Sequence, residues 1–326
     1  MEWRTSGRPI LALAAILIPA TFAGCEMDDA RDDGPPDLPG PIAQAIDAPG
    51  PFPIQLLPPA GELTDGIAVE PLGSFVVTAA LDADPIESVL SMHYWNEEEE
   101  RWGEPRQLHF SEAGFGDSSP ALAPDGSYLL FASARPGDNP AAGDVNIWIA
   151  QREGESDGEI QWTDPWLVPA VFSPAWDGAP SLAGDGSLYF SSMREGPTEG
   201  LNLHVAPFED GMWMAPQKLP EPVNSSVDDS DPYISPDQSF MVFASNREGL
   251  WNLYLVHAEG EGWGEPQLLD AASDESANDR APYMTAAGSH LFWVRDGEVM
   301  AAPAEAVGIE ARDTESEVAR AGAGEG

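Results

Sequence analysis

The sequence contains very few basic residues and almost no cysteine. Only 14 of its 326 residues are Lys or Arg, and Lys218 is the one lysine, whereas 56 residues are Asp or Glu, so the formal net charge is −42. A chain this acidic repels nucleic acid and anionic lipid headgroups, and we expect neither as a partner. The single cysteine, Cys25, excludes an internal disulfide, and the five histidines are too scattered to form a metal site.

The N-terminal residues have the features of a secretory signal. Arg4 and Arg8 precede a short apolar run, and small residues precede Cys25. This end of the run resembles the lipobox of bacterial lipoproteins, in which the cysteine becomes the lipidated first residue of the mature chain. We therefore expect residues 1–24 to be a lipoprotein signal peptide and Cys25 to be the lipidation site. The alternative is ordinary cleavage near Ala23.

A lipid anchor would place the protein in the cell envelope, on the periplasmic face of the outer membrane or at the cell surface. Residues 25–50 are rich in Asp, Pro and Gly and have few large apolar side chains, which predicts a disordered tether. Residues 306–326 are similarly poor in aromatics, and we expect a disordered tail there. The anchor would then be the only contact with the membrane.

Between these tails the sequence repeats itself. The run SDPYISPDQSFMVFASNREGLWNLYLVHAEGEGWGEPQLL, residues 230–269, has the same pattern as residues 178–219, and three further copies are recognisable. Each copy contains short apolar runs separated by turn residues such as Pro-Asp-Gly, which is typical of antiparallel strands joined by tight turns. Four-stranded units repeated about every fifty residues are typical of β-propeller blades.

Two periodic markers give the number of blades. An acidic residue precedes five inner strands, but the Trp-x-x-Pro pattern that begins an outer strand occurs only four times, at Trp102, Trp162, Trp213 and Trp263. Pro53 stands 52 residues before Pro105 and supplies the missing strand. We predict an all-β, monomeric, five-bladed β-propeller over residues 51–305, with four-stranded antiparallel blades and with the N-terminal strand completing the last blade.

The run SPDQSFMVFASNREGLWNLYL, residues 235–255, resembles the propeller repeat of TolB and related periplasmic proteins, which are distant cousins of the tryptophan-aspartate propellers. The resemblance covers residues 117–300 clearly and 53–110 weakly. It implies a propeller exported from the cytoplasm, but families with this repeat include scaffolds, peptidase-gating domains and many lipoproteins. The resemblance therefore does not indicate a ligand.

Candidate site residues follow from the face of a propeller on which binding sites are usually found. The loops that enter the inner strands and those that join the second and third strands surround one mouth of the channel. We expect a top-face ring of carboxylates there, formed by Asp65, Asp117, Asp177, Asp229, Asp231 and Asp279. The second set of loops carries Arg135, Arg194, Arg247 and Arg295, which we expect to pair with the aspartates or with backbone carbonyls of the adjacent blade.

Two further readings of this ring remain open. A carboxylate that has no arginine to pair with, together with Asp228 and Asp231 nearby, could bind a cation or a basic ligand. If the cation is a metal, we expect calcium, because hard oxygen ligands are abundant. We expect no required cofactor. Trp176 departs from the repeat and is a candidate ligand contact. The four outer-strand tryptophans recur at equivalent places, so we expect them to pack between blades.

Three functions fit this sequence. The first is a lipid-anchored binding or scaffold propeller that presents its top face to an envelope protein, a peptide or a glycan. The second is a glycan-cleaving hydrolase, in which a pair of carboxylates would flank the sugar. The third is a purely structural envelope protein. We favour the first, because the acids occupy repeated positions as structural residues do, and no nucleophile motif or phosphate loop is present.

Overall fold

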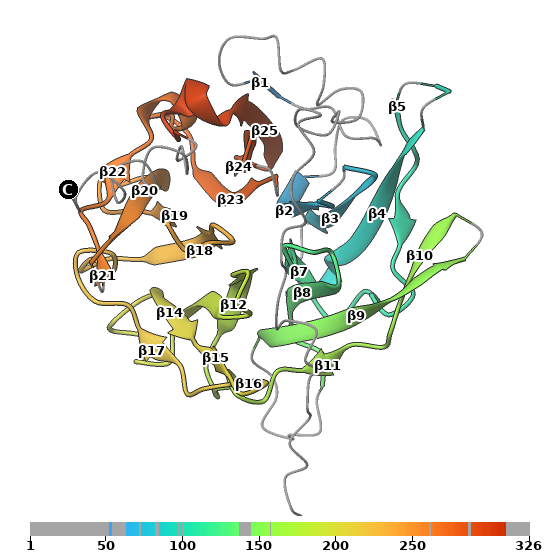
Figure 1. The fold of residues 1–326 in the computed structure, drawn as a ribbon, viewed down its shortest axis with the longest axis horizontal. Coiled ribbons are helices and arrows are strands. Elements are labelled where there is room, and N and C mark those ends of the chain that lie inside the picture. Colours follow the sequence, from blue (N-terminus) through green and yellow to red (C-terminus); the bar gives the residue numbers. More distant parts are fainter. Residues whose placement is uncertain are drawn as a thin grey trace, which may run out of the picture.

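The protein forms a ring of five antiparallel blades in a computed structural model (Figure 1). The structure describes residues 52–53, 63–71, 73–81, 85–96, 98–99, 101–136, 145–156, 158–260, 262–285 and 288–310. The expected signal peptide, Cys25, the tether and most of the C-terminal tail lie outside these residues. No helix in the described ranges is long and apolar enough to cross a membrane.

Each blade takes its strands in chain order from the channel outward, and the final blade is completed by the N-terminus. The first blade contains β2 (Leu63–Val69), β3 (Phe75–Leu81), β4 (Val89–Asn96), β5 (Arg101–Trp102) and β6 (Arg106–Gln107). The second contains β7 (Ser118–Leu122), β8 (Tyr128–Ser133), β9 (Asn146–Ser156), β10 (Glu159–Trp162) and β11 (Trp166–Leu167).

The third blade contains β12 (Asp177–Leu182), β13 (Leu188–Ser192), β14 (Asn202–Ala206) and β17 (Gln217–Lys218), beside the small hairpin of β15 (Phe208–Glu209) and β16 (Met212–Trp213). The fourth contains β18 (Asp229–Ile234), β19 (Phe240–Ser245), β20 (Asn252–Glu259), β21 (Gly262–Trp263) and β22 (Gln267–Leu268). The fifth contains β23 (Asp279–Met284), β24 (His290–Arg295), β25 (Glu298–Pro303) and β1 (Phe52–Pro53).

The ring closes as the sequence predicts. Strand β1 pairs antiparallel with β25, with Phe52 opposite Ala301 and Pro53 opposite Met300. The N-terminal strand therefore completes a blade whose other three strands come from the C-terminal end of the ring. This pairing covers an otherwise open sheet edge and joins the two ends of the ring.

The apolar core lies between neighbouring blades. Trp102, 1% exposed, packs with Phe292 and Val299 of the fifth blade, and Trp162 is buried between the first and second blades. Trp213 and Trp263 pack in the same manner further round the ring. The outer-strand tryptophans are thus wedges between blades, as expected.

The packed domain extends beyond the end expected at residue 305. A 3-10 helix, Ala304–Val307, follows β25, and Val307 and Ile309 are buried in the core between the fourth and fifth blades. These two apolar side chains give this short segment enough buried surface to order. The start of the predicted tail, residues 306–310, therefore belongs to the folded domain.

Candidate functional site at the channel mouth

Four of the predicted aspartates lie in the same kind of buried cage. Asp117, Asp177, Asp229 and Asp279 are all 0% exposed, and each accepts a hydrogen bond from a guanidinium at 2.5 to 2.8 Å, from Arg135, Arg194, Arg247 and Arg295 respectively. Each carboxylate also accepts from the segment that enters its strand. In the third blade, for example, the backbone amide and hydroxyl of Ser173 donate to Asp177 Oδ2 at 2.9 and 2.7 Å.

Each cage joins an aspartate and an arginine of the same blade to the connection that enters that blade. Arg194 binds the Asp177 of its own blade and also donates from Nη2 to the carbonyl of Val171, at 2.7 Å, in the connection that enters that blade. Arg247 does the same with Val223. The arginines thus pair with the aspartates, which is one of the two contacts expected for them, and the carbonyls that they also reach lie in the connections between consecutive blades. The hydrogen bonds fix the connection between consecutive blades, which is a structural role.

The described residues of the first blade form no such cage, because Asp65 does not occupy the repeated position. Thr64 lies opposite Ala80 on β3, just as Asp229 lies opposite Ser245 in the fourth blade. Asp65 is the extra residue of a β-bulge between Thr64 and Gly66. The other four inner strands also contain a bulge. Asp65 lines the channel mouth because it stands one residue after the caged position, where the fifth blade has Arg280.

A cavity of about 400 Å³ opens at this mouth. Its wall includes Asp65 and Ile86 of the first blade, Trp176 of the third, Asp231 of the fourth, and Asn278, Arg280 and Asp296 of the fifth. The indole of Trp176 lies over Gly178, where a Cβ atom would come within 2.6 Å of the ring. A side chain at position 178 would therefore displace Trp176, so Gly178 permits its position in the wall.

Asp231 and Arg280 form an ion pair between the fourth and fifth blades. Nε of Arg280 donates to Asp231 Oδ2 at 2.9 Å, and the hydroxyl of Ser230 donates to Oδ1 at 3.0 Å. The guanidinium of Arg280 also stacks over Trp251, 4.5 Å from the ring centre. Asp231 raises the pKa of Arg280, so the guanidinium stays charged.

Asp65 has the most perturbed carboxyl group in this cavity. Burial, reinforced by the negative charge of Asp231, raises the pKa of Asp65 from 3.8 to about 6, although Arg280 opposes the shift. No hydrogen-bond donor to this carboxyl is found among the described residues. Asp65 is therefore partly protonated just below neutral pH and fully charged above it.

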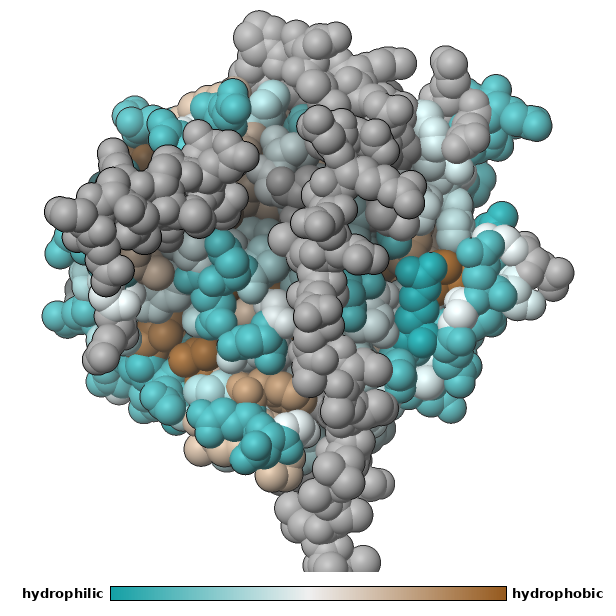
Figure 2. All heavy atoms as spheres, in the orientation of Figure 1, coloured by the Kyte–Doolittle hydropathy of each residue, from teal (hydrophilic) through white to brown (hydrophobic). Residues whose placement is uncertain are grey.

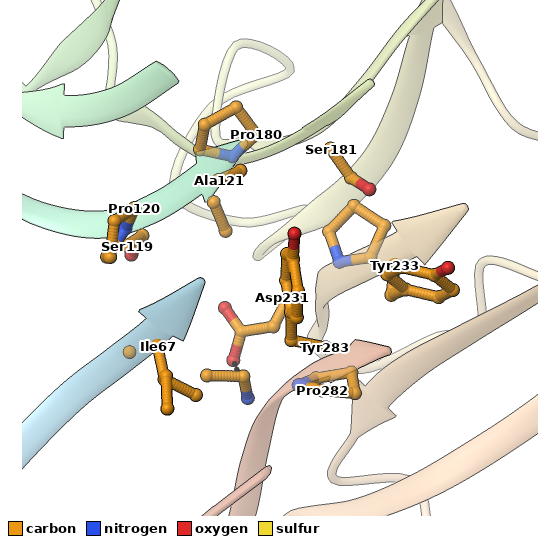
Figure 3. A pocket seen from close by; sticks show the side chains of 14 residues that line it. Ile67, Ser119, Pro120, Ala121, Pro180, Ser181, Asp231, Tyr233, Pro282 and Tyr283 are labelled. Atoms are coloured by element: carbon orange, nitrogen blue, oxygen red, sulfur yellow. Dashed lines mark hydrogen bonds between the residues drawn. The ribbon is translucent and has the colours of Figure 1, made fainter. Parts of the chain in front are cut away.

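The floor of the cavity is closed by the inner strands. Pro120, Pro180, Pro232 and Pro282 occupy equivalent positions in four blades and surround a much smaller hollow of about 40 Å³. Figure 3 shows Asp231 in this hollow, beside Tyr283 and Pro282, and its hydrogen bond from the amide of Ala281. Because Asp231 borders both spaces, it lies at the floor of the mouth cavity.

Other predicted ligands lie outside this cavity. Asp228 accepts hydrogen bonds from the amide of Leu201, at 2.8 Å, and from Asn246, and does not line the cavity. Within the described residues there is no group of three or more His, Cys, Asp or Glu side chains that could hold a metal ion.

Figure 2 shows hydrophilic residues over much of the described surface on the face drawn, with smaller apolar patches among them.

Sequence reasoning missed Arg280, Asn278 and Asp296. Arg280 stands directly after a caged aspartate, where the second, third and fourth blades have Ser118, Gly178 and Ser230. A charged residue at a position that is otherwise small was the available signal. Its partner Asp231 similarly stands where two other blades have alanine, at Ala179 and Ala281.

Comparisons with known proteins do not narrow the function. No protein-family model matches this chain, and no curated protein is similar to it. The structure of a putative TolB from Agrobacterium tumefaciens is similar, with a TM-score of 0.47 and 16% identity over 72% of this chain and 70% of that one. A thermostable family-43 glycoside hydrolase has a TM-score of 0.48 and 12% identity, over 74% of this chain and 89% of its own. Membership of a TolB-like family stays a prediction.

Proposed function

We propose that the protein is a binding propeller whose ligand, a protein, a peptide or a glycan, enters the mouth cavity. The observation that carries this proposal is where the blades depart from their common pattern. Asp65, Trp176, Asp231 and Arg280 each break the repeat, and all four line one cavity. Structural residues of a repeat ring recur from blade to blade, whereas a single ligand requires a site without that symmetry.

The cellular setting completes the proposal. Lipidation of Cys25 would tether the propeller to a membrane of the cell envelope, and residues 25–50 would let the mouth reach its ligand. The strong negative charge supports a soluble ectodomain that stays clear of anionic headgroups.

The test is binding of the full-length chain, purified in detergent, to arrays of glycans and peptides. We expect saturable binding that is weakened at least tenfold by Trp176→Ala and left unchanged by Met212→Ala, because Met212 is exposed on the β15–β16 hairpin and does not line the cavity. Saturable binding that ignores Trp176→Ala would place the ligand elsewhere. No saturable ligand at all would favour the purely structural role.

One observation favours a second candidate, a glycan-cleaving hydrolase. The pKa of Asp65 is raised to about 6, whereas Asp231 is hydrogen-bonded by the Arg280 guanidinium, and two carboxyls in such different settings suit an acid and a base. This candidate predicts glycoside turnover that is abolished by either Asp65→Asn or Asp231→Asn. Binding without turnover over a panel of envelope glycans would exclude it.

A further inference from the structure

The carboxylates at the mouth differ in whether the protein supplies their hydrogen-bond donors. The four caged aspartates each have an arginine, and Asp231 has Arg280. Asp296 accepts from the amide and side chain of Asn278, both at 3.2 Å. Asp65 is the exception, with no donor among the described residues.

The cavity as a whole is short of positive charge. Its lining contains three carboxylates, Asp65, Asp231 and Asp296, and one guanidinium, that of Arg280. Arg280 hydrogen-bonds to Asp231 and acts on Asp65 only from a distance, so Asp65 forms no ion pair within the described residues. Burying an unpaired carboxylate is unfavourable, and a ligand cation would remove this penalty.

Trp176 gives the same cavity a second means of holding a cation. The face of an indole attracts ammonium and guanidinium groups, most strongly where water is excluded. The neighbouring contact of Arg280 with Trp251, at 4.5 Å, is this interaction within the protein itself. A cation held in this cavity would have both an indole and a carboxylate in its lining.

The surroundings of the cavity favour a polypeptide as the source of that cation. Ile86, Val227 and Leu250 are three of the four large hydrophobic side chains that are well exposed in the described part of the chain. Each lies in a loop that either enters an inner strand or joins a second strand to a third, the loops that surround the mouth. Apolar contacts around a polar centre suit a protein or peptide better than a free ion.

On the basis of the binding function proposed above, we propose that the mouth cavity receives a Lys or Arg side chain of a partner polypeptide, with Asp65 as its counter-ion. The cavity, about 400 Å³, has room for such a side chain. The flanking residues of the partner lie against Ile86, Val227 and Leu250. The formal charge of −42 attracts a basic segment from a distance.

The probe is an array of heptapeptides with a fixed central Lys or Arg and random flanks, incubated with the detergent-purified full-length chain. Matched arrays carry acetyl-lysine or citrulline, which keep the shape and remove the charge. We expect at least tenfold stronger binding to the charged arrays at pH 7, lost in Asp65→Asn and retained in Asp164→Asn, whose carboxylate is exposed and outside the cavity.

Binding should also weaken about tenfold between pH 7 and pH 5, because Asp65 takes up a proton near pH 6 while Arg280 keeps its charge. The other carboxylates that face the cavity are Asp231, which is paired with Arg280, and Asp296, which is hydrogen-bonded to Asn278. Equal binding to charged and neutral arrays, or no effect of Asp65→Asn, would overturn the cation assignment. Glycan binding that depends on Trp176, without peptide binding, would overturn that assignment but keep the binding function. No ligand of either kind would overturn both.

Discussion

Replacing Asp65 with Asn should stabilise the protein at neutral pH. The side chain of Asp65 is half-buried beside Asp231, and its pKa is raised from 3.8 to about 6. The folded state therefore holds this proton more tightly than the unfolded state does, so stability falls as the pH rises from 3.8 to 6 and stays reduced above pH 6. Asn has no proton to lose and avoids this penalty.

The size of the effect follows from the two pKa values. Linkage gives a penalty of about 3 kcal/mol at pH 7.5 and about 1.6 kcal/mol at pH 5. The advantage of Asp65→Asn over the wild type should thus grow by about 1.4 kcal/mol between pH 5 and pH 7.5. Differences between Asp and Asn that do not depend on pH cancel in this comparison.

Urea unfolding at the two pH values measures this change, and pH 5 keeps the protein above its sequence pI of about 4.1. Asp231→Asn is the matched control. The substitution removes the carboxylate that pairs with Arg280, so we expect the free energy of unfolding to fall by about 1–3 kcal/mol. This change is opposite in sign to the one expected for Asp65→Asn. An Asp65→Asn protein that is less stable than the wild type by the same amount at both pH values would refute the reasoning.

Three further changes test the fold and the anchor. Arg194→Met leaves Asp177 buried without its cation, and urea unfolding should show a loss of stability of about 3–5 kcal/mol. The control is Arg106→Met, which breaks an exposed pair with Glu159 and should change stability by less than about 1 kcal/mol. Deleting residues 51–58 removes β1 and should lower the melting temperature strongly, and deleting residues 31–38 should not; equal melting temperatures would contradict the closure of the fifth blade. Cys25→Ser should move the protein from the membrane to the soluble fraction of a cell extract, and lipid labelling that persists in this variant would contradict the anchor.

The architecture was predictable because its markers recur with the blades. Trp102, Trp162, Trp213 and Trp263 count four outer strands, and the spacing from Pro53 to Pro105 locates the fifth. The tryptophan positions and the proline spacing can both be read from distances along the chain. The pairing of β1 with β25 follows from the same count, so the closure of the ring could be predicted without knowing any contact in space.

The site was less predictable because the acidic residue of the first copy stands one residue later in its inner strand than the acidic residues of the other four copies. If the copies are aligned on their first acidic residue, Asp65 matches Asp117. If they are aligned on the last residue of the inner strand, which is Val69 in the first blade and Leu122 in the second, the residue that matches Asp117 is Thr64. The second alignment agrees with the strand pairing. The approach of Arg280 to Asp231 depends on neighbouring blades in the ring, which the spacing along the chain does not reveal.

The cavity borders the seam between the fifth and first blades, the two blades that the closure of the ring brings together. The amide of Thr64 donates to the carbonyl of Gly297 at 2.9 Å, and the hydroxyl of Tyr283 donates to the carbonyl of Val69 at 3.0 Å. Arg280, Asn278 and Asp296 come from the blade that β1 completes. A ligand that contacts Asp65 and the fifth blade together would bind the closed ring in preference to the open one, and would therefore stabilise the closure as well as the site.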